Sequence, residues 1–511
     1  MAGQNMESTA SGKETQVLEE TKETLLDDIF DKLDIEKTAD SFEIDNFSDP
    51  EAMVKNPNQT RIAQTKVLLD WISQIGEPLK RLDRSVLDDL ISMIDQKLSS
   101  QLDEIIHHAE FQKLESSWRG LEFLVKRTDF RQGVIIEVLD VDKEELIESF
   151  EDAMDTTESE LYDLVYNRAL DRFGDHPYSS MISNFEFTKS AQDMALLRDV
   201  SKVAAAAHCP FIGSVNPKFF GVNSMDDLLK IKDINARLRT ADYIKWNSFR
   251  ESSDSRFVGL AFPRFMLRLP YGPETSKVKG FNYIEDVKAK DHDKYLWGNA
   301  SFAFASNLTR AFVDDGWTIQ IRGLESGGRV EDLCIHNYET SKGTQTKIST
   351  EVCISERMEL ELANLGFIPF VHEHAKDFAT FYSASSTQKP QEYHNNPEAN
   401  KNSKINARLP YLFLAARISH YLKTLQRRNI GSSKSGSVIQ SELNEWLSAY
   451  VTKVPNPGPK EIAKYPLKEA KVTVVEKEDD PGYFTTDIFL RPHFQVEGLD
   501  ISLKLVGDIP G

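Results

Sequence analysis

One short arrangement of residues in this chain could bind a metal ion. His372, Glu373 and His374 are consecutive, and two histidines one residue apart on a strand can chelate zinc when a third ligand is supplied. The order differs from His-Glu-x-x-His, the helical pattern that places two imidazoles on one face. The sequence identifies no third ligand, so hydrogen-bonded or solvated histidines are the favoured interpretation. A metal-dependent enzyme that uses His372 and His374 stays as an alternative.

Two glycine-containing stretches could bind phosphate or present a nucleophile, but neither has the required spacing. Residues 322–329 contain three glycines without the Gly-Lys-Ser/Thr ending of a P-loop and without G-x-G-x-x-G. Residues 213–215, Gly-Ser-Val, lack the second glycine of a nucleophile elbow. The chain has 81 Asp and Glu residues, so acidic pairs arise by chance and identify no acid–base chemistry. The sequence favours assembly over catalysis and indicates no cofactor.

The composition narrows the class of protein. A chain of 511 residues is long enough for about two or three domains, and a net charge of −20 argues against nucleic-acid binding. No apolar run is long enough to span a membrane, and the acidic N-terminus does not resemble a signal peptide. Cys209, Cys334 and Cys353 are interpreted as buried free thiols in a reducing compartment. These features predict a cytoplasmic protein that does not insert into membranes.

Residues 1–58 are predicted to form a disordered acidic tail, with 15 acidic against 5 basic residues. The exception is an amphipathic helix at about residues 24–33, whose leucines, isoleucine and phenylalanine share one face. A helix of this length is marginal alone in water. It either packs on its own body or binds a groove on another protein. The residues proposed for such binding are Leu25, Leu26, Asp27, Asp28, Ile29, Phe30 and Leu33.

Residues 59–385 are predicted to form an N-terminal domain. Apolar residues at helical spacing indicate helices between 60 and 128. A mixed α/β region follows, with strands expected at 134–139, 181–187 and 211–215 and helices at 143–154, 159–169 and 191–207. Because the last helix lies between two strands, at least one parallel pair is expected.

Residues 386–511 are predicted to form a C-terminal domain, which begins with a polar linker or long loop that extends to about residue 404. Pro410 opens a long helix to about Asn429, and a second helix is expected at 440–451. Polar residues form a stripe on the first helix, which is either solvated or a contact with an acidic partner. The stripe contains Arg417, His420, Thr424, Arg427 and Arg428.

The segment from Lys471 to Gly511 predicts three consecutive strands without a covering helix. Such a short sheet is rarely stable alone, and its edges expose unpaired backbone groups. It is therefore either a terminal meander of its own domain or an acceptor of strands from another chain. The residues expected at the strand-exchange site are Phe484, Ile488, Leu490, Leu499, Ile501, Leu503 and Leu505.

Several ordered blocks of sequence resemble one known family. The blocks are Ser117–Val125, Phe257–Gly272, Tyr295–Ala300, Ile354–Phe367, Gln388–Pro390, Ala407–Leu414 and Arg491–Leu499. From about residue 60 to its end, the chain resembles the large subunit of the type VI secretion contractile sheath, the TssC/VipB family. The resemblance implies an α/β (mixed α+β) fold. Its core would be like that of contractile phage-tail sheaths, with N-terminal helices and C-terminal strands that form an intermolecular sheet.

The resemblance also implies partners and a function. A small TssB/VipA-like sheath subunit would donate strands to the C-terminal sheet, and many copies would form a helical tubule around an inner Hcp tube. Contraction would propel the tube and its effectors out of the cell, starting from a baseplate. Residues 25–30 resemble the segment read by a ClpV-type AAA+ ATPase, and Arg417, Arg427 and Arg428 are candidates for contact with the tube or another partner. A single-chain sheath of a phage-tail-like particle is a further alternative.

Overall fold

The computed structural model describes residues 84–495, except 173, 274, 276–280, 282, 289, 341–342, 395 and 478–482. The chain divides into two units, Met1–Ile94 and Asp95–Gly511, and residues 95–385 and 386–511 belong to the same unit. The predicted acidic tail, its helix at 24–33 and the third terminal strand lie outside the described residues. The division proposed at residue 385 stays a prediction.

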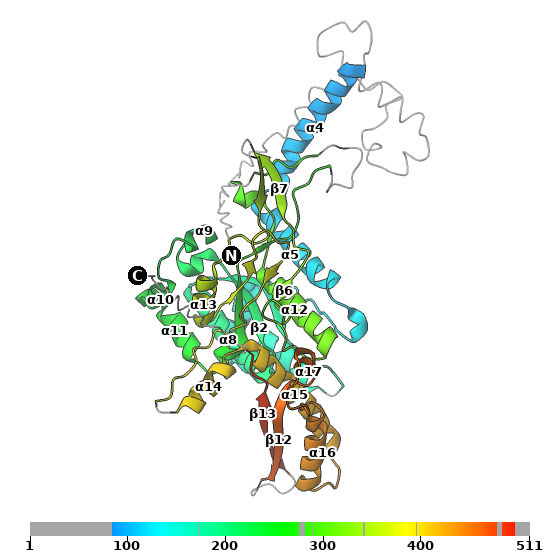
Figure 1. The fold of residues 1–511 in the computed structure, drawn as a ribbon, viewed down its shortest axis with the longest axis vertical. Helices are drawn as coiled ribbons and strands as arrows, with labels where there is room; N and C mark the ends of the chain where they lie inside the picture. The colour runs from blue at the N-terminus through cyan, green and yellow to red at the C-terminus, as the bar shows by residue number, and fades with distance from the viewer. Residues whose placement is uncertain are drawn as a thin grey trace, which may run out of the picture. The chain divides into compact units, whose positions relative to one another are not determined.

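A four-stranded parallel sheet forms the centre of the second unit (Figure 1). Its order is β1 (Met181–Phe187), β2 (Phe211–Val215), β3 (Val258–Phe262) and β9 (Ile368–Pro369). Helix α8 (Ala191–Ala207) connects β1 to β2, which confirms the predicted parallel pair. Every residue of β2 and β3 is buried, as expected for a parallel sheet covered on both faces.

Helices and aromatic side chains fill the space around this sheet. Helix α8 begins where the Ser190 hydroxyl accepts a hydrogen bond from the backbone N–H of Asp193. Trp246, on α11 (Ile244–Glu251), stacks on Phe367 with ring centroids 5.5 Å apart. A Cβ atom at Gly259 would lie 2.8 Å from Leu409 Cδ1. The glycine therefore lets the long helix α15 (Leu409–Asn429) approach β3 closely.

The described chain contains further helices and 3₁₀ turns outside this sheet. Before residue 316, the other described helices are α4 (Arg84–Ile106), α5 (Ala109–Lys126), α6 (Lys143–Asp152), α7 (Glu160–Tyr162), the π-helix η4 (Asp163–Asp171), α9 (Met225–Leu228), α10 (Ile234–Leu238) and α12 (Ala300–Asp315). Later come α13 (Glu356–Asn364) and α14 (Pro397–Asn406). The described 3₁₀ turns are η2 (Phe130–Gln132), η3 (Thr156–Glu158), η5 (Pro217–Phe220), η6 (Ala241–Tyr243), η7 (Asp254–Phe257) and η8 (His292–Lys294).

The smaller sheets use short strands. The pair β4 (Phe265–Met266) and β5 (Trp297–Gly298) is antiparallel. The hairpin of β7 (His336–Thr340) and β8 (Gly343–Lys347) is separate from it. A three-stranded sheet contains β10 (Val371–His372), β11 (Ala379–Thr380) and β6 (Arg329–Val330). None of the described helices is long and apolar enough to cross a bilayer.

A second hydrophobic cluster organises the C-terminal elements. Helix α15 continues through a turn into α16 (Gly436–Ser448), and α17 (Pro459–Lys464) precedes the hairpin of β12 (Leu467–Glu476) and β13 (Phe484–Pro492). The buried members of the cluster include Trp317, Ile418, Leu422, Leu443, Leu447, Leu467 and Val472. The two predicted helices and the first two predicted terminal strands are therefore confirmed.

Three expectations from the sequence were wrong. Residues 134–139 form no strand, since no described segment pairs with them. The linker expected up to residue 404 contains α14, which begins at Pro397 because the Asn396 side chain accepts a hydrogen bond from Ala399 N–H. Of the three cysteines expected to be buried, Cys209 is buried, Cys334 is half-buried and Cys353 is exposed.

Candidate assembly interface

The C-terminal hairpin projects from the body of the second unit, with α16 along one side (Figure 1). Strands β12 and β13 pair antiparallel from Leu467 opposite Pro492 to Glu476 opposite Phe484. Its inner face packs on the second cluster through side chains from both strands. The contributing residues include Val472, Val474, Phe484 and Leu490. Burial of these apolar side chains holds the hairpin on α15 and α16.

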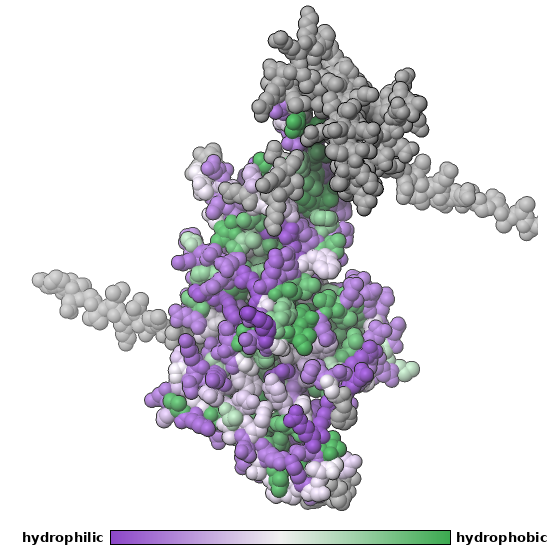
Figure 2. Space-filling view, turned by 90° about the vertical axis from the view of Figure 1, so that its right-hand side faces the viewer, coloured by the Kyte–Doolittle hydropathy of each residue, from purple (hydrophilic) through white to green (hydrophobic). Residues whose placement is uncertain are grey.

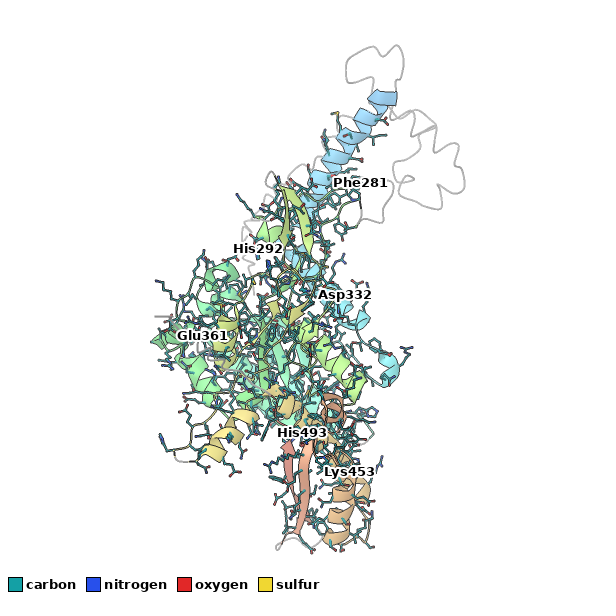
Figure 3. The ribbon with its side chains drawn as sticks, in the orientation of Figure 1. Phe281, His292, Asp332, Glu361, Lys453 and His493 are labelled. Atoms are coloured by element: carbon teal, nitrogen blue, oxygen red, sulfur yellow. The ribbon has the colours of Figure 1, made fainter. Side chains whose placement is uncertain are left out.

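The hairpin is also anchored at its base, near His493 (Figure 3). The backbone N–H of His493 donates to the carbonyl of Pro466 at 3.1 Å, and His493 Nε2 lies 2.8 Å from the Thr452 hydroxyl. Burial lowers the pKa of His493, and nearby Lys468 lowers it further. Beyond β13, the backbone N–H of Gln495 donates to the Tyr411 hydroxyl at 2.8 Å.

Side-chain amides of α16 cover the outer edge of β12. Asn444 Oδ1 accepts from the backbone N–H of Val472 at 2.8 Å, and Asn444 Nδ2 donates to the Val472 carbonyl at 2.8 Å. Gln440 Oε1 accepts from the backbone N–H of Val474 at 2.9 Å. These side chains make the hydrogen bonds that a neighbouring strand would otherwise make. The edge of β12 is thus protected from strand addition at these positions.

The opposite edge of the hairpin belongs to β13 and is open in the described part of the chain. In an antiparallel pair, residues whose backbone groups point outward alternate with residues that bond the partner strand. Since Val472 and Val474 bond α16, the residues opposite them also point outward. The four outward-pointing residues of β13 are Phe484, Thr486, Ile488 and Leu490. Among residues 84–495 as described, no hydrogen bond reaches their backbone groups.

Three of the residues predicted for strand exchange lie on this strand. The side chains of Phe484 and Leu490 are half-buried against the second cluster, while Ile488 is 38% exposed. On the opposite face of the hairpin, Val475 and Phe489 are more than half exposed. Leu499, Ile501, Leu503 and Leu505 lie outside the described residues, as do residues 25–33. Their roles stay predictions.

The three arginines predicted to contact a partner have different surroundings. Arg427 Nη2 donates to the Leu170 carbonyl at 2.6 Å and Nη1 to the Arg172 carbonyl at 3.3 Å. Arg417 lies over the Tyr421 ring, 4.7 Å from its centroid. Arg428 is exposed, and no described residue bonds its side chain. Arg427 is therefore engaged within the subunit, and Arg428 is the arginine most available to a partner.

His420, on the same polar stripe, is buried. Its Nε2 donates to the Ala207 carbonyl at 2.8 Å, which joins α15 to the end of α8. Burial lowers the pKa of His420 to about 4. The hydrogen bond to Ala207 raises this pKa, and the charge of Arg417 lowers it further. The Nδ1 atom of His420 has no described partner. His420 and Arg417 both line a cavity of about 20 Å³, a volume sufficient for one water molecule.

The histidines considered for metal binding have no suitable partners among the described residues. His372 is buried, and its Nδ1 lies 2.9 Å from the Ser349 hydroxyl. Burial lowers its pKa, and nearby His374 lowers it further. His374 is exposed. Across the described ranges, no cluster of three or more His, Cys, Asp or Glu side chains is positioned to hold a metal.

Buried ion pairs in the body were not identified from the sequence. Arg264 Nη2 lies 2.7 Å from Glu351 Oε1, which is also 3.1 Å from His292 Nε2 (labelled in Figure 3). Burial would raise the pKa of Glu351, but the hydrogen bond from His292 and the charge of Arg264 lower it to about 2. A second pair joins Arg268 to Glu285 at 2.7 Å. The partners of the first pair are 87 residues apart, so no local pattern predicts it.

The loop at residues 322–329 is a tight structural turn, as expected from the sequence. Gly323 and Gly327 have positive φ angles of 81° and 86°, which favour glycine. The Gly327 carbonyl accepts a hydrogen bond from Arg310 Nη2 at 2.7 Å. The Gly328 N–H donates to the Gly323 carbonyl at 2.9 Å, so these groups hold the turn together.

Comparison with known proteins identifies similar sequences along most of the chain. The VipB family described as "EvpB/VC_A0108, tail sheath N-terminal domain" matches residues 88–388. The family described as "EvpB/VC_A0108, tail sheath gpW/gp25-like domain" matches residues 398–509. The type VI secretion system sheath protein TssC1 of Pseudomonas aeruginosa is 41% identical over 428 residues, which cover 83% of this chain and 86% of that protein.

Two similar solved structures come from the anti-feeding prophage. One is its baseplate, six-fold symmetrised, with a TM-score of 0.36 and 11% identity over 74% of this chain and 84% of the other. Another is its helical sheath in the contracted state, with a TM-score of 0.31 and 10% identity over 60% of this chain and 66% of the other.

Proposed function

Because the chain belongs to the VipB (EvpB/VC_A0108) tail sheath family, we propose that it assembles by accepting a β-strand on the outer edge of β13. The chain is a structural subunit of a type VI secretion contractile sheath. In the proposal, the incoming strand comes from a small TssB/VipA-like sheath subunit. The observation that carries it is the asymmetry of the hairpin, whose β12 edge is covered by Asn444 and Gln440, while no described residue bonds the outer edge of β13.

Strand addition suits a lattice that must change shape without coming apart. Each main-chain hydrogen bond contributes about 0.5–1.5 kcal/mol net, which is modest for one subunit and large when repeated along a tubule. A contact between different surfaces that does not close on itself generates a helical filament. The hairpin extends from the body, so the globular parts of neighbouring subunits can rotate while the shared sheet stays intact.

The remaining partners are proposed on the family relationship. The tubule would enclose an inner Hcp tube, begin at a baseplate and be disassembled by a ClpV-type ATPase that binds the segment Leu25–Leu33. The extended lattice would be metastable, and contraction would increase the contact area between globular faces. No catalytic step or nucleotide is needed during contraction in this proposal. The protein would work in the cytoplasm.

A proline at Ile488 tests the proposed acceptor edge. The backbone N–H of Ile488 points away from β12, so Ile488→Pro removes no hydrogen bond within the hairpin. Proline is tolerated at such positions of edge strands. We expect co-expression of this variant with the small sheath subunit to yield few or no tubules by negative-stain microscopy. Ile488→Ala, which keeps the N–H, should assemble.

Two further measurements complete this test. The thermal midpoint of Ile488→Pro should stay close to that of Ile488→Ala, which shows that the hairpin still folds. Wild-type numbers of tubules from a folded Ile488→Pro protein would refute strand addition at β13. Tubules that form without any small subunit would instead favour a single-chain sheath.

A further inference from the structure

The segment from Val134 to Val141 is largely apolar, has no regular secondary structure and is unpaired among the described residues. It follows η2 and precedes α6, and its sequence is Val-Ile-Ile-Glu-Val-Leu-Asp-Val, rich in the β-branched residues that favour strands. Ile135 is 69% exposed, Val138 is 68% exposed and Leu139 is 53% exposed. Three large apolar side chains so close in sequence and so exposed are typical of a surface that another chain covers.

The backbone of this segment is unpaired as well. Among the described residues, no backbone N–H or carbonyl of residues 134–141 takes part in a hydrogen bond with another backbone group, and no described side chain bonds to them. Eight successive residues therefore offer their donors and acceptors together. An extended strand from another chain can satisfy such a row in a regular way.

The segment is held in place at both ends. Ile136 packs on the small cluster of Leu124, Phe302 and Ala305, and Val141 packs on the main core. The Tyr178 hydroxyl donates to the Glu137 carboxylate, and this contact raises the pKa of Tyr178 to about 12. These contacts fix the backbone before a partner arrives, which lowers the entropic cost of strand addition.

Acidic residues lie among and directly after the exposed apolar side chains in the sequence. Between residues 137 and 152 there are eight Asp and Glu residues and one lysine. All eight acids are exposed, whereas Lys143 is paired with Asp193 at 2.5 Å. This part of the chain, the cyan segment with α5 and α6, lies on the side of Figure 1 that faces the viewer in Figure 2, where apolar green patches lie among hydrophilic residues.

We propose that residues 134–141 accept a second β-strand, from a chain other than this one, with apolar residues at alternate positions and Lys or Arg beside it. The acidic surroundings disfavour this chain's own N-terminal tail, which has 15 acidic and 5 basic residues in positions 1–58. They also disfavour a second copy, since the net charge of the chain is −20. The identity of the donor rests on the proposed function: it is the small sheath subunit. That subunit would then contact this chain at a site in the body as well as at the hairpin.

Hydrogen exchange in assembled tubules tests the pairing directly. The proposal predicts that amides in residues 134–141 exchange about tenfold or more slowly than the same sequence in an unstructured peptide, although no described group of their own chain protects them. Amides at residues 153–155, beside the 96% exposed Met154, provide the unprotected reference. Exchange of 134–141 at the unstructured rate in intact tubules would overturn the proposal.

Cross-linking identifies the donor. A photoreactive maleimide label is placed on Val138→Cys, and the matched control label on Met154→Cys, both with the exposed Cys353 replaced by serine. In tubules assembled with the small subunit, we expect the label at position 138 to cross-link to that subunit and the label at 154 to give at most a tenth of that yield. Cross-links from position 138 to another copy of this chain, or to its own terminal segments, would overturn the proposal.

A charge-reversal variant tests the role of the acidic residues beside the segment. Glu144→Lys combined with Glu148→Lys reverses two exposed charges next to the segment and should lower the cross-linking yield several-fold at low salt. Glu398→Lys, a reversal on α14, should leave the yield unchanged. Equal cross-linking yields in the Glu144→Lys/Glu148→Lys variant and in Glu398→Lys would contradict a partner strand with basic residues beside it.

The outcomes separate this inference from the proposed function. If wild-type chains and small subunits form no tubules, the proposed function fails. If tubules form and depend on the β13 edge, while residues 134–141 exchange freely and cross-link to nothing, only the second strand site fails.

Discussion

The arginines of α15 show that a polar stripe on a helix can combine internal and external roles. Arg427 donates to two backbone carbonyls at the end of η4, at 2.6 and 3.3 Å, and its side chain is 19% exposed. Arg428, one position further along the helix, is exposed. The helical spacing placed both on one polar face, but it could not reveal that the end of η4 lies against one of them.

These two arginines give a matched pair of substitutions. We expect Arg427→Ala to lower the free energy of unfolding by about 1–3 kcal/mol, because charged hydrogen bonds to two backbone carbonyls are lost. Arg428→Ala should stay within about 0.5 kcal/mol of wild type. Urea unfolding of the purified variants measures both, and equal effects would contradict the internal role of Arg427.

His420 makes stability depend on pH in a defined window. Its pKa is about 4 in the folded chain and about 6.5 when unfolded, so the unfolded state binds more protons between these values. Stability from this group is complete above pH 6.5 and is lost as the pH falls towards 4, with a total of about 3 kcal/mol or less. The charged neighbours Arg417 and Lys423 and the ring of His208 also oppose protonation of His420.

His420→Gln tests this assignment, since glutamine keeps a donor for the Ala207 carbonyl and does not titrate. Urea midpoints between pH 7 and 4 should fall less steeply for the variant than for wild type. Glu351, whose folded pKa is about 2, loses its contribution only as the pH falls from about 4.5 to 2, so it does not obscure this window. Parallel curves for the two proteins would contradict the role of His420.

Among the elements, the edge of β12 depends on α16. Asn444→Ala removes both hydrogen bonds to Val472 and leaves the edge unpaired at that position, while Gln440 still bonds Val474. We expect the Val472 amide to exchange at least about tenfold faster, with a loss of about 1–2 kcal/mol in the stability of the hairpin. Glu445→Ala, at the exposed next position, is the control. Unchanged exchange of the Val472 amide in Asn444→Ala would show that the Asn444 side chain is not needed to protect this edge.

The elements also show where sequence patterns succeed and fail. The β1–α8–β2 unit was predictable because its apolar runs and the Ser190 cap act locally. Residues 134–139 have strand propensity, but a strand also needs a partner, and the described part of the chain supplies none. Helix α14 was mistaken for a linker because its composition is polar, although Asn396 followed by Pro397 is a helix-start signal.

At the scale of the molecule, the family blocks of sequence predicted the sheath fold and function, because they extend over most of the chain. The polar connections in the core were not predictable. Arg264 and Glu351, or Arg268 and Glu285, come together only after the body has folded. The assembly surface was not predictable from the sequence either. The edge of β13 is recognised as the acceptor only once the structure shows that α16 covers the edge of β12.

In the proposed lattice, the subunit completes its C-terminal sheet with a strand from another chain. A cryo-EM map of wild-type tubules, at a resolution that separates strands, would show whether this strand is present. We expect a strand of the small subunit along Phe484–Leu490, hydrogen-bonded to the outward backbone groups of β13. Well-ordered tubules in which this edge faces solvent, or is paired by residues of the same chain, would contradict it.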